Sequence, residues 1–126
     1  MFRRRDLVFG LDLALPHIIK YDSVFICEGL FDVISMHEAG FKNVVATLGT
    51  TITPQQLQAL RFFTNNLVFA FDGDSAGQAA TIFARALAQS MSFHVDALTF
   101  PEGEDPNSLF NKKGVLGFTN FVTEQL

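Results

Sequence analysis

Cysteine is nearly absent from this sequence of 126 residues, and long apolar segments are missing altogether. The single cysteine, Cys27, excludes a disulfide scaffold and a zinc site built from several cysteines. No apolar run approaches the roughly 18 residues that cross a membrane. The opening residues, Met1 to Arg5 followed by Asp6, lack the apolar stretch of a signal peptide. We therefore expect a cytoplasmic protein that has no membrane partner.

Positive charge is also scarce beyond the first residues. The chain has a net charge of −4. Residues 1–20 carry four cations and two acids, whereas residues 21–126 carry five cations and eleven acids, a net charge of −6. A surface of this kind binds a phosphate backbone poorly. If the protein handles nucleic acid, we expect a metal ion or a neighbouring domain to supply the missing positive charge.

The sequence does contain short apolar runs that alternate with longer segments of helical spacing. Nearly continuous apolar runs predict parallel strands that are buried on both faces. The predicted fold is α/β and Rossmann-like, with a central, mainly parallel four-stranded sheet and helices on both faces. The predicted strands are 23–27, 44–46, 67–71 and 93–98, and the predicted helices are 10–20, 30–39, 54–63, 75–91 and a stretch from Asp105 onward that is broken near residues 114–117.

Acidic residues follow two of the predicted strands. Glu28 ends the first strand, and Asp72 and Asp74 follow the third. In a flavodoxin-like strand order these two strands are neighbours, and sites form beyond the carboxyl ends of such strands. We therefore expect the three carboxylates to converge on one crevice. Because clustered carboxylates repel one another, they favour a bound Mg²⁺ or Mn²⁺ ion.

The segment Asp72-Gly73-Asp74 also fits a simpler interpretation, a turn followed by a helix N-cap. A calcium loop does not fit, because the twelfth position is Phe83 instead of glutamate. Glu28 is harder to explain as a structural residue, since an acid at the end of an apolar strand needs a partner. The two motifs together favour a site.

Four motifs in order are similar to the Toprim domain of bacterial replicative DNA primases of the DnaG type. They are Phe25–Ile34 (FICEGLFDVI), Gly40–Thr50 (GFKNVVATLGT), Phe71–Ala80 (FDGDSAGQAA) and Gly103–Pro106 (GEDP). The resemblance covers roughly residues 22–110. It implies the Toprim fold, with segment 1–21 as a lead-in from the primase core, residues 22–105 as the Toprim domain and residues 106–126 as a C-terminal helical segment. It also implies that the chain is a piece of a longer protein.

The resemblance assigns metal and catalytic roles to the acids. Glu28, Asp72 and Asp74 match the family's catalytic metal-site acids. Asp32 and Asp105 match further acids of the same cluster. The implied cofactor is Mg²⁺ or Mn²⁺, with two or more ions present when a nucleoside triphosphate is bound. Glu28 is implied either as a metal ligand or as a general base, and the sequence does not choose between them.

Other positions match the family less completely. Asn107 replaces the family's second acid after Asp105, which weakens a metal role there, although its neutral oxygen is still available. Arg4 stands where primases usually carry lysine, and it is implied as a phosphate ligand. Gly29, Gly49 and Thr50 match positions that line the crevice and bind the nucleotide.

The activity implied is metal-dependent nucleotidyl transfer, the synthesis of short RNA primers on single-stranded DNA for replication. Its partners are nucleoside triphosphates, a DNA template and RNA primer held through other domains, and a replicative helicase. We expect this chain alone to be inactive. Two alternatives stay open: another Toprim enzyme, such as a stand-alone nuclease or a topoisomerase fragment, and a non-catalytic adaptor in recombination and repair. Tyr21 is the only tyrosine available to a topoisomerase, and it has no supporting motif.

Overall fold

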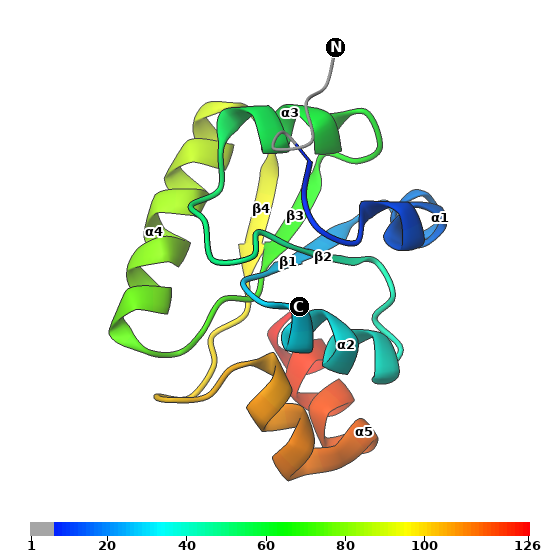
Figure 1. The fold of residues 1–126 in the computed structure, drawn as a ribbon, viewed down its shortest axis with the longest axis vertical. Coiled ribbons are helices and arrows are strands. Elements are labelled where there is room, and N and C mark those ends of the chain that lie inside the picture. The colour runs from blue at the N-terminus through cyan, green and yellow to red at the C-terminus, as the bar shows by residue number, and fades with distance from the viewer. Residues whose placement is uncertain (1–6) are drawn as a thin grey trace.

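The computed structural model of the chain describes residues 7–126 and contains one four-stranded sheet. The strand order is β2-β1-β3-β4, and every neighbouring pair is parallel (Figure 1). This confirms the α/β fold with a parallel sheet that the sequence predicts. The elements in chain order are α1 (Leu11–Tyr21), β1 (Val24–Cys27), α2 (Leu30–Glu38), β2 (Val44–Ala46), α3 (Pro54–Arg61), β3 (Asn66–Phe69), α4 (Ser75–Ser90), β4 (His94–Ala97) and α5 (Pro106–Gln125).

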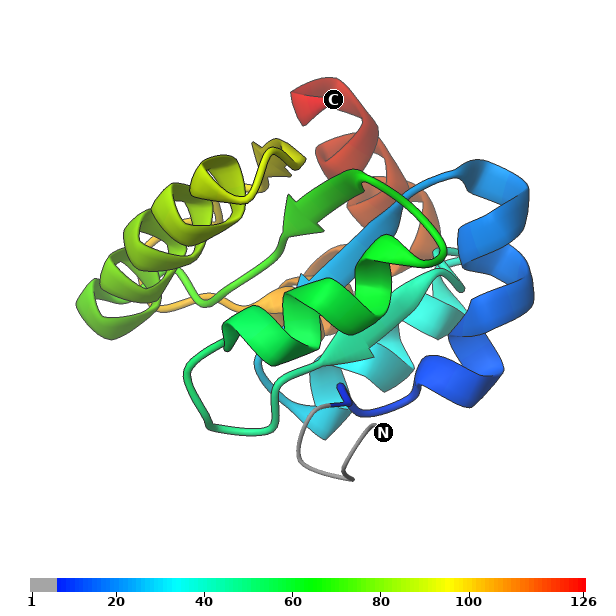
Figure 2. The same cartoon turned by 90° about the horizontal axis from the view of Figure 1, so that it is seen from above.

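Two hydrophobic cores cover the two faces of the sheet, as expected for a parallel sheet buried on both sides. The first core lies between the sheet and helices α1, α3 and α4, with Ile18, Leu57 and Ala84 among its members. The second core lies between the sheet and helices α2 and α5, where Met36 and Phe118 are fully buried. Figure 2 shows the helices on the two sides of the sheet. The apolar strand runs of the sequence therefore contribute to both cores at once.

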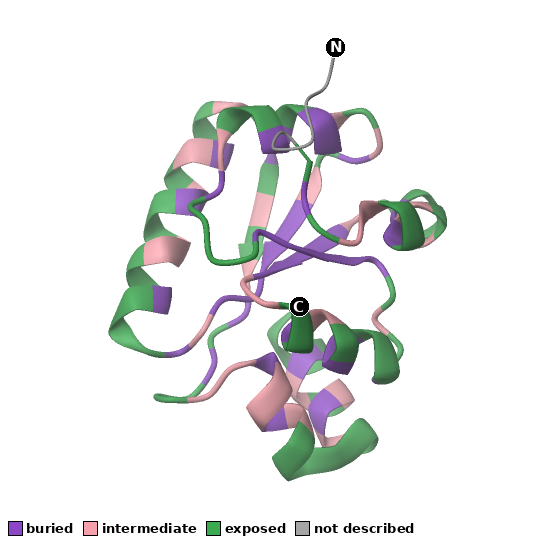
Figure 3. Ribbon diagram, in the orientation of Figure 1, coloured by how far each residue is buried: buried purple, intermediate pink, exposed green. Residues whose placement is uncertain are grey.

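The two edges of the sheet differ in burial, as Figure 3 shows. Strands β1 and β2 are buried throughout, whereas β4 alternates between exposed and half-buried residues. β2 lies at an edge, but Phe9 pairs with Ala46 in an antiparallel bridge through hydrogen bonds of 2.8 and 3.1 Å. The segment before α1 thus covers the β2 edge and leaves β4 as the more exposed one.

The helix ends match the signals in the sequence. Thr53 caps α3 in a reciprocal capping box with Gln56, and proline follows the cap. Gly114 has φ 72° and interrupts α5, which confirms the predicted break. β3 ends at Phe69, two residues before the predicted end, although the amide of Ala70 still donates to the carbonyl of Ile26. Among residues 7–126, every helix is too short or too polar to serve as a membrane span.

Candidate metal centre

The carboxyl ends of β1 and β3 meet where the chain reverses its direction of winding. From β1 the chain passes to β2 on one side and then to β3 on the other, which makes the β1–β3 boundary the topological switch point. Glu28 follows β1 and Asp72 lies just beyond β3. The backbone N–H of Asp72 donates to Oε1 of Glu28 at 2.7 Å. The two predicted acidic motifs are therefore in direct contact.

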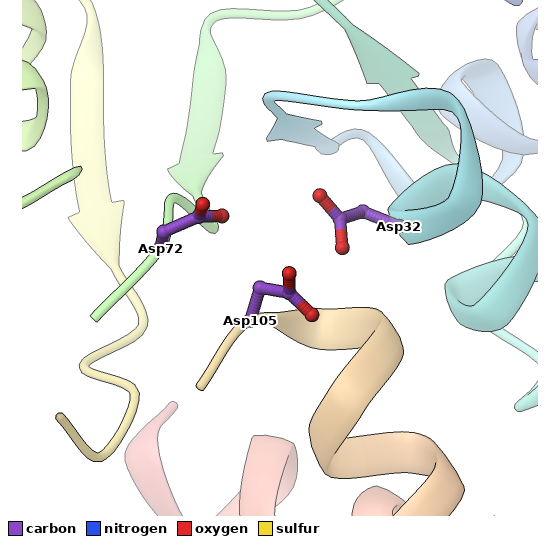
Figure 4. A group of neighbouring side chains, drawn as sticks. All are labelled: Asp32, Asp72 and Asp105. Atoms are coloured by element: carbon purple, nitrogen blue, oxygen red, sulfur yellow. The ribbon is translucent and has the colours of Figure 1, made fainter. Parts of the chain in front are cut away.

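Three aspartates point toward one another beside this contact, as Figure 4 shows. Asp32 lies in the first turn of α2, Asp72 beyond β3, and Asp105 at the N-cap of α5. One carboxylate oxygen from each lies within 4.8 Å of the others. Three elements far apart in the sequence thus place like charges together at one end of the sheet.

Asp105 reaches the centre because the loop before α5 is fastened to the loop after β3. The amide of Gly73 donates to the carbonyl of Glu104 at 2.8 Å. Asp105 then caps α5, accepting from the amide of Ser108 at 2.7 Å. Glu104, which lies just before α5, forms an ion pair with Lys112 of that helix, with Oε2 and Nζ 2.6 Å apart. The position of Asp105 is therefore set by its immediate neighbours on both sides.

Asp32 is held by α5 through Asn107. The amide of Asn107 donates to Oδ1 of Asp32 at 3.0 Å. The side-chain oxygen of Asn107 accepts from the hydroxyl of Ser35 at 2.9 Å. The residue that replaces the family's second acid therefore joins α2 to α5, and its neutral oxygen is engaged by Ser35. No feature of the sequence identifies Ser35, because 72 residues separate these partners.

The electrostatics of the centre are those of crowded carboxylates. Burial, together with the charges of Glu28, Asp32 and Asp105, raises the pKa of Asp72 to about 7. Burial likewise raises the pKa of Asp32 to about 6, aided by the charge of Asp105 and opposed by the amide of Asn107. Near neutral pH the chain therefore holds these acids together at an energetic cost.

A hard divalent cation fits this arrangement. Oδ1 of Asp72 is buried and accepts no hydrogen bond from the residues that the structure describes. An unpartnered buried carboxylate oxygen is costly, and a cation among the three aspartates would satisfy it. All the donors are oxygens, which favours Mg²⁺ or Mn²⁺ over zinc. The donor separations, within 4.8 Å, suit ligands on one ion.

The other predicted acids and glycines lie around this group. Asp74 is exposed, and its Oδ1 accepts from the amide of Gly77 at 2.7 Å, so it caps α4 as the simpler interpretation expected. A ligand role for Asp74 stays a prediction. Gly29 directly precedes α2, whose first turn carries the cluster residue Asp32. Gly77 is required by close approach, because a Cβ there would overlap the carbonyl group of Asp72. Arg4 lies outside the described residues.

A cavity of about 500 Å³ adjoins the acids on the side of α4. Glu28, Gly49 and Thr50 line it, together with Phe83 of α4. The sequence identified the first three as site residues, whereas an apolar core position is the simplest prediction for Phe83. That prediction is wrong, because Phe83 is 51% exposed and lines the cavity. An apolar residue of helical spacing carries no signal for a role at a site.

Comparison with known proteins gives a consistent result. The Toprim-like family model matches residues 25–110. A DNA primase of Staphylococcus aureus is 38% identical over 122 residues, which are 97% of this chain and 20% of that protein. The Aquifex aeolicus primase structure, comprising zinc-binding and RNA polymerase domains, superposes with a TM-score of 0.90 at 31% identity, covering 99% of this chain and 31% of that one.

A third match is the structure of a DnaG primase catalytic domain bound to single-stranded DNA. It has a TM-score of 0.83 at 29% identity and covers 99% of this chain and 40% of that domain. The chain spans about a fifth of the length of the curated primases it matches. Its fold, its motifs and the family match agree over most of the sequence. The chain therefore belongs to the Toprim-like family.

Proposed function

We propose that this chain is the metal-binding Toprim part of a DnaG-type DNA primase, an enzyme that synthesises RNA primers on single-stranded DNA. The observation that carries the proposal is the unpartnered, buried Oδ1 of Asp72, whose carboxylate lies beside those of Asp32 and Asp105 at the switch point of the sheet. The primase names of its relatives support the primase over a stand-alone nuclease, a topoisomerase fragment or an adaptor.

In this proposal Asp32, Asp72 and Asp105 hold Mg²⁺ or Mn²⁺. A bound divalent ion would neutralise triphosphate charge and stabilise the negative charge that develops during phosphoryl transfer. Glu28 orients the centre, because its carboxylate fixes the backbone amide of Asp72. The requirement for two or more ions, and a ligand role for Asp74, belong to the same proposal.

The remaining partners follow from the charge of the chain. Residues 21–126 carry a net charge of −6, so the metal and other domains must attract the phosphates. We propose nucleoside triphosphates as the ligands that this chain contacts with its metal. The template, the RNA primer and a replicative helicase would be held mainly by parts of the full protein beyond this chain.

The test is a chimera in which this chain replaces the matching 122 residues of the Staphylococcus aureus primase. We expect the chimera to synthesise RNA primers on single-stranded DNA in the presence of Mg²⁺ or Mn²⁺. Asp72→Asn in the chimera should lower the rate by at least about 100-fold, since removing a key charge-stabilising group costs about that much. Asp96→Asn, on the exposed β4 edge, is the matched control.

A folded chimera without priming activity would contradict the proposal, as would an active chimera that tolerates Asp72→Asn. Circular dichroism and thermal melting establish that each chimera is folded. Nicking of a plasmid by the isolated chain with Mn²⁺ would favour the nuclease instead.

The isolated chain should bind single-stranded DNA only weakly. Its net negative charge opposes the phosphate backbone, so we expect a dissociation constant weaker than about 10 µM at ~150 mM salt. Fluorescence anisotropy with a labelled oligonucleotide measures this directly. A dissociation constant below about 1 µM at that salt concentration would contradict the proposal that other domains hold the template.

A further inference from the structure

Helices α2 and α5 meet beside the acidic centre, and each contributes one of its aspartates. Asp32 lies in the first turn of α2 and Asp105 caps α5, and Figure 4 shows the two side chains approaching from these helices. Carboxylates as close as these repel each other. The contact between the two helices at this point must therefore be maintained by groups other than the acids.

One residue of α5, Asn107, makes two hydrogen bonds to α2. Its backbone amide donates to Oδ1 of Asp32 at 3.0 Å, and its side-chain oxygen accepts from the hydroxyl of Ser35 at 2.9 Å. Asp32 and Ser35 are three residues apart, so they lie on the same face of α2. The two bonds join the helices at neighbouring points, which restricts both sliding and rotation of α5 against α2.

The bond between Ser35 and Asn107 is sheltered from water. Ser35 is 4% exposed, and the neighbouring Asp32 is 6% exposed. On the side of α5, Pro106 and Leu109 are buried as well. A polar group that loses its partner in such a place is not readily hydrated, so breaking the bond is costly. The bond therefore favours one arrangement of the two helices against the repulsion of their carboxylates.

The effect of Asn107 on the centre is indirect. Its side-chain oxygen accepts from two donors, the hydroxyl of Ser35 and the side-chain nitrogen of Asn111 at 3.5 Å. An amide oxygen has two lone pairs, and both are used here. The side chain of Asn107 is thus engaged within the protein, and it is not available as a ligand of a cation.

We propose that Ser35 and Asn107 are positioning residues of the metal centre. Their hydrogen bond holds the first turn of α5 against α2, and so keeps Asp32 and Asp105 close enough to bind one divalent ion together with Asp72. The inference rests on the proposed function, because it takes the three aspartates as the metal ligands. Groups that orient metal ligands in this way contribute about 10-fold to 100-fold to metal affinity.

The test measures the Mn²⁺ dissociation constant of the chain and of its variants by calorimetry. Ser35→Ala removes the donor and Asn107→Ala removes the acceptor, and each should weaken Mn²⁺ binding about 10-fold. The double variant should also lose about 10-fold instead of about 100-fold, because both changes break the same bond. Asn107→Asp keeps an acceptor oxygen for Ser35, so it should bind Mn²⁺ at least as tightly as the wild-type chain.

Thr64→Val is the matched control, because Thr64 precedes β3 and therefore lies at the opposite end of the sheet. Thr64 is also 4% exposed, and its hydroxyl donates to Oδ1 of Asp22 at 2.9 Å. Thr64→Val should lower the Tm about as much as Ser35→Ala does, by about 4 °C, since each removes one buried hydroxyl bond. It should leave the Mn²⁺ affinity unchanged.

Three results would overturn the positioning role while the metal centre stands: Ser35→Ala binds Mn²⁺ as tightly as the wild-type chain, the two single losses add in the double variant, or Asn107→Asp binds as weakly as Asn107→Ala. An equal loss of Mn²⁺ affinity in Thr64→Val would assign the effect to general stability and overturn the role as well. If the wild-type chain itself shows no saturable Mn²⁺ binding, the metal centre fails and the positioning role fails with it.

Discussion

Replacing Asp72 by asparagine will abolish saturable Mn²⁺ binding and, without metal, make the chain more stable at pH 8. Both effects come from one carboxylate, whose buried Oδ1 lacks a partner and whose neighbours are negative. Asparagine keeps the shape, removes a charge and brings an amide that can donate to Asp32 or Asp105. We expect Mn²⁺ affinity to fall by at least about 100-fold, measured by calorimetry, because an essential anionic ligand is lost.

The stability effect depends on pH in a defined direction. The pKa of Asp72 rises from 3.8 to about 7 on folding, so the folded chain holds this proton more tightly than the unfolded chain. The unfavourable contribution is absent near pH 4, grows as the pH rises, and is complete above about pH 7. Asp72 is only partly buried, so solvent screens the repulsion. We expect Asp72→Asn to gain about 1 kcal/mol at pH 8, roughly 4 °C in Tm, and almost nothing at pH 4.

Metal should reverse the order of the two proteins. Mn²⁺ at 100 times its dissociation constant stabilises the wild-type chain by about 2.7 kcal/mol, and it should not stabilise Asp72→Asn. Asp96→Asn makes the same chemical change at an exposed position on β4, and it should alter neither Mn²⁺ affinity nor the pH dependence. Unchanged Mn²⁺ affinity in Asp72→Asn, or a Tm that falls at pH 8 without metal, would show that the carboxylate is structural.

The pairing of Glu28 with Asp72 follows from the sequence, whereas the rest of the centre does not. Apolar runs predict the strands, and strand–helix alternation predicts parallel neighbours. Once β1 and β3 are adjacent, the residues that follow them must lie together at the switch point. That step needs only local patterns and one topological rule, and the order β2-β1-β3-β4 agrees with it.

Asp105 shows where reasoning from local pattern ends. Its approach to Asp72 depends on the path of residues 98–104 after the edge strand, and a long-range hydrogen bond from Gly73 to Glu104 ties that path to the loop after β3. Periodicity carries no information about such a contact, and only the family resemblance indicated it. Asp74 shows a different limit. Its spacing fits both a metal ligand and an N-cap, because both need an oxygen on a short side chain, and the structure shows the cap.

Gly73→Ala will destabilise the chain strongly, although it adds only one methyl group near the centre. A Cβ at Gly73 would overlap the carbonyl oxygen of Pro101 and lie 2.7 Å from that of Phe100. Both are backbone atoms, so the loop before α5 must move as a whole. The same glycine donates to the carbonyl of Glu104, and that bond would be strained as well. We expect a loss of about 2–3 kcal/mol, roughly 10 °C in Tm by calorimetry.

The metal affinity should fall together with the stability, because displacing this loop withdraws Asp105 from Asp72 without altering any acid. Gly103→Ala is the control within the same loop. Its Cβ would meet nothing within 4 Å, and only its φ of +77° is unfavourable, so we expect a cost of about 1 kcal/mol and unchanged Mn²⁺ binding. If the two variants lose equal stability and both retain Mn²⁺, the contact between Gly73 and the loop does not position the centre. A selective loss of Mn²⁺ in Gly73→Ala would instead identify this backbone contact as the feature that completes the cluster.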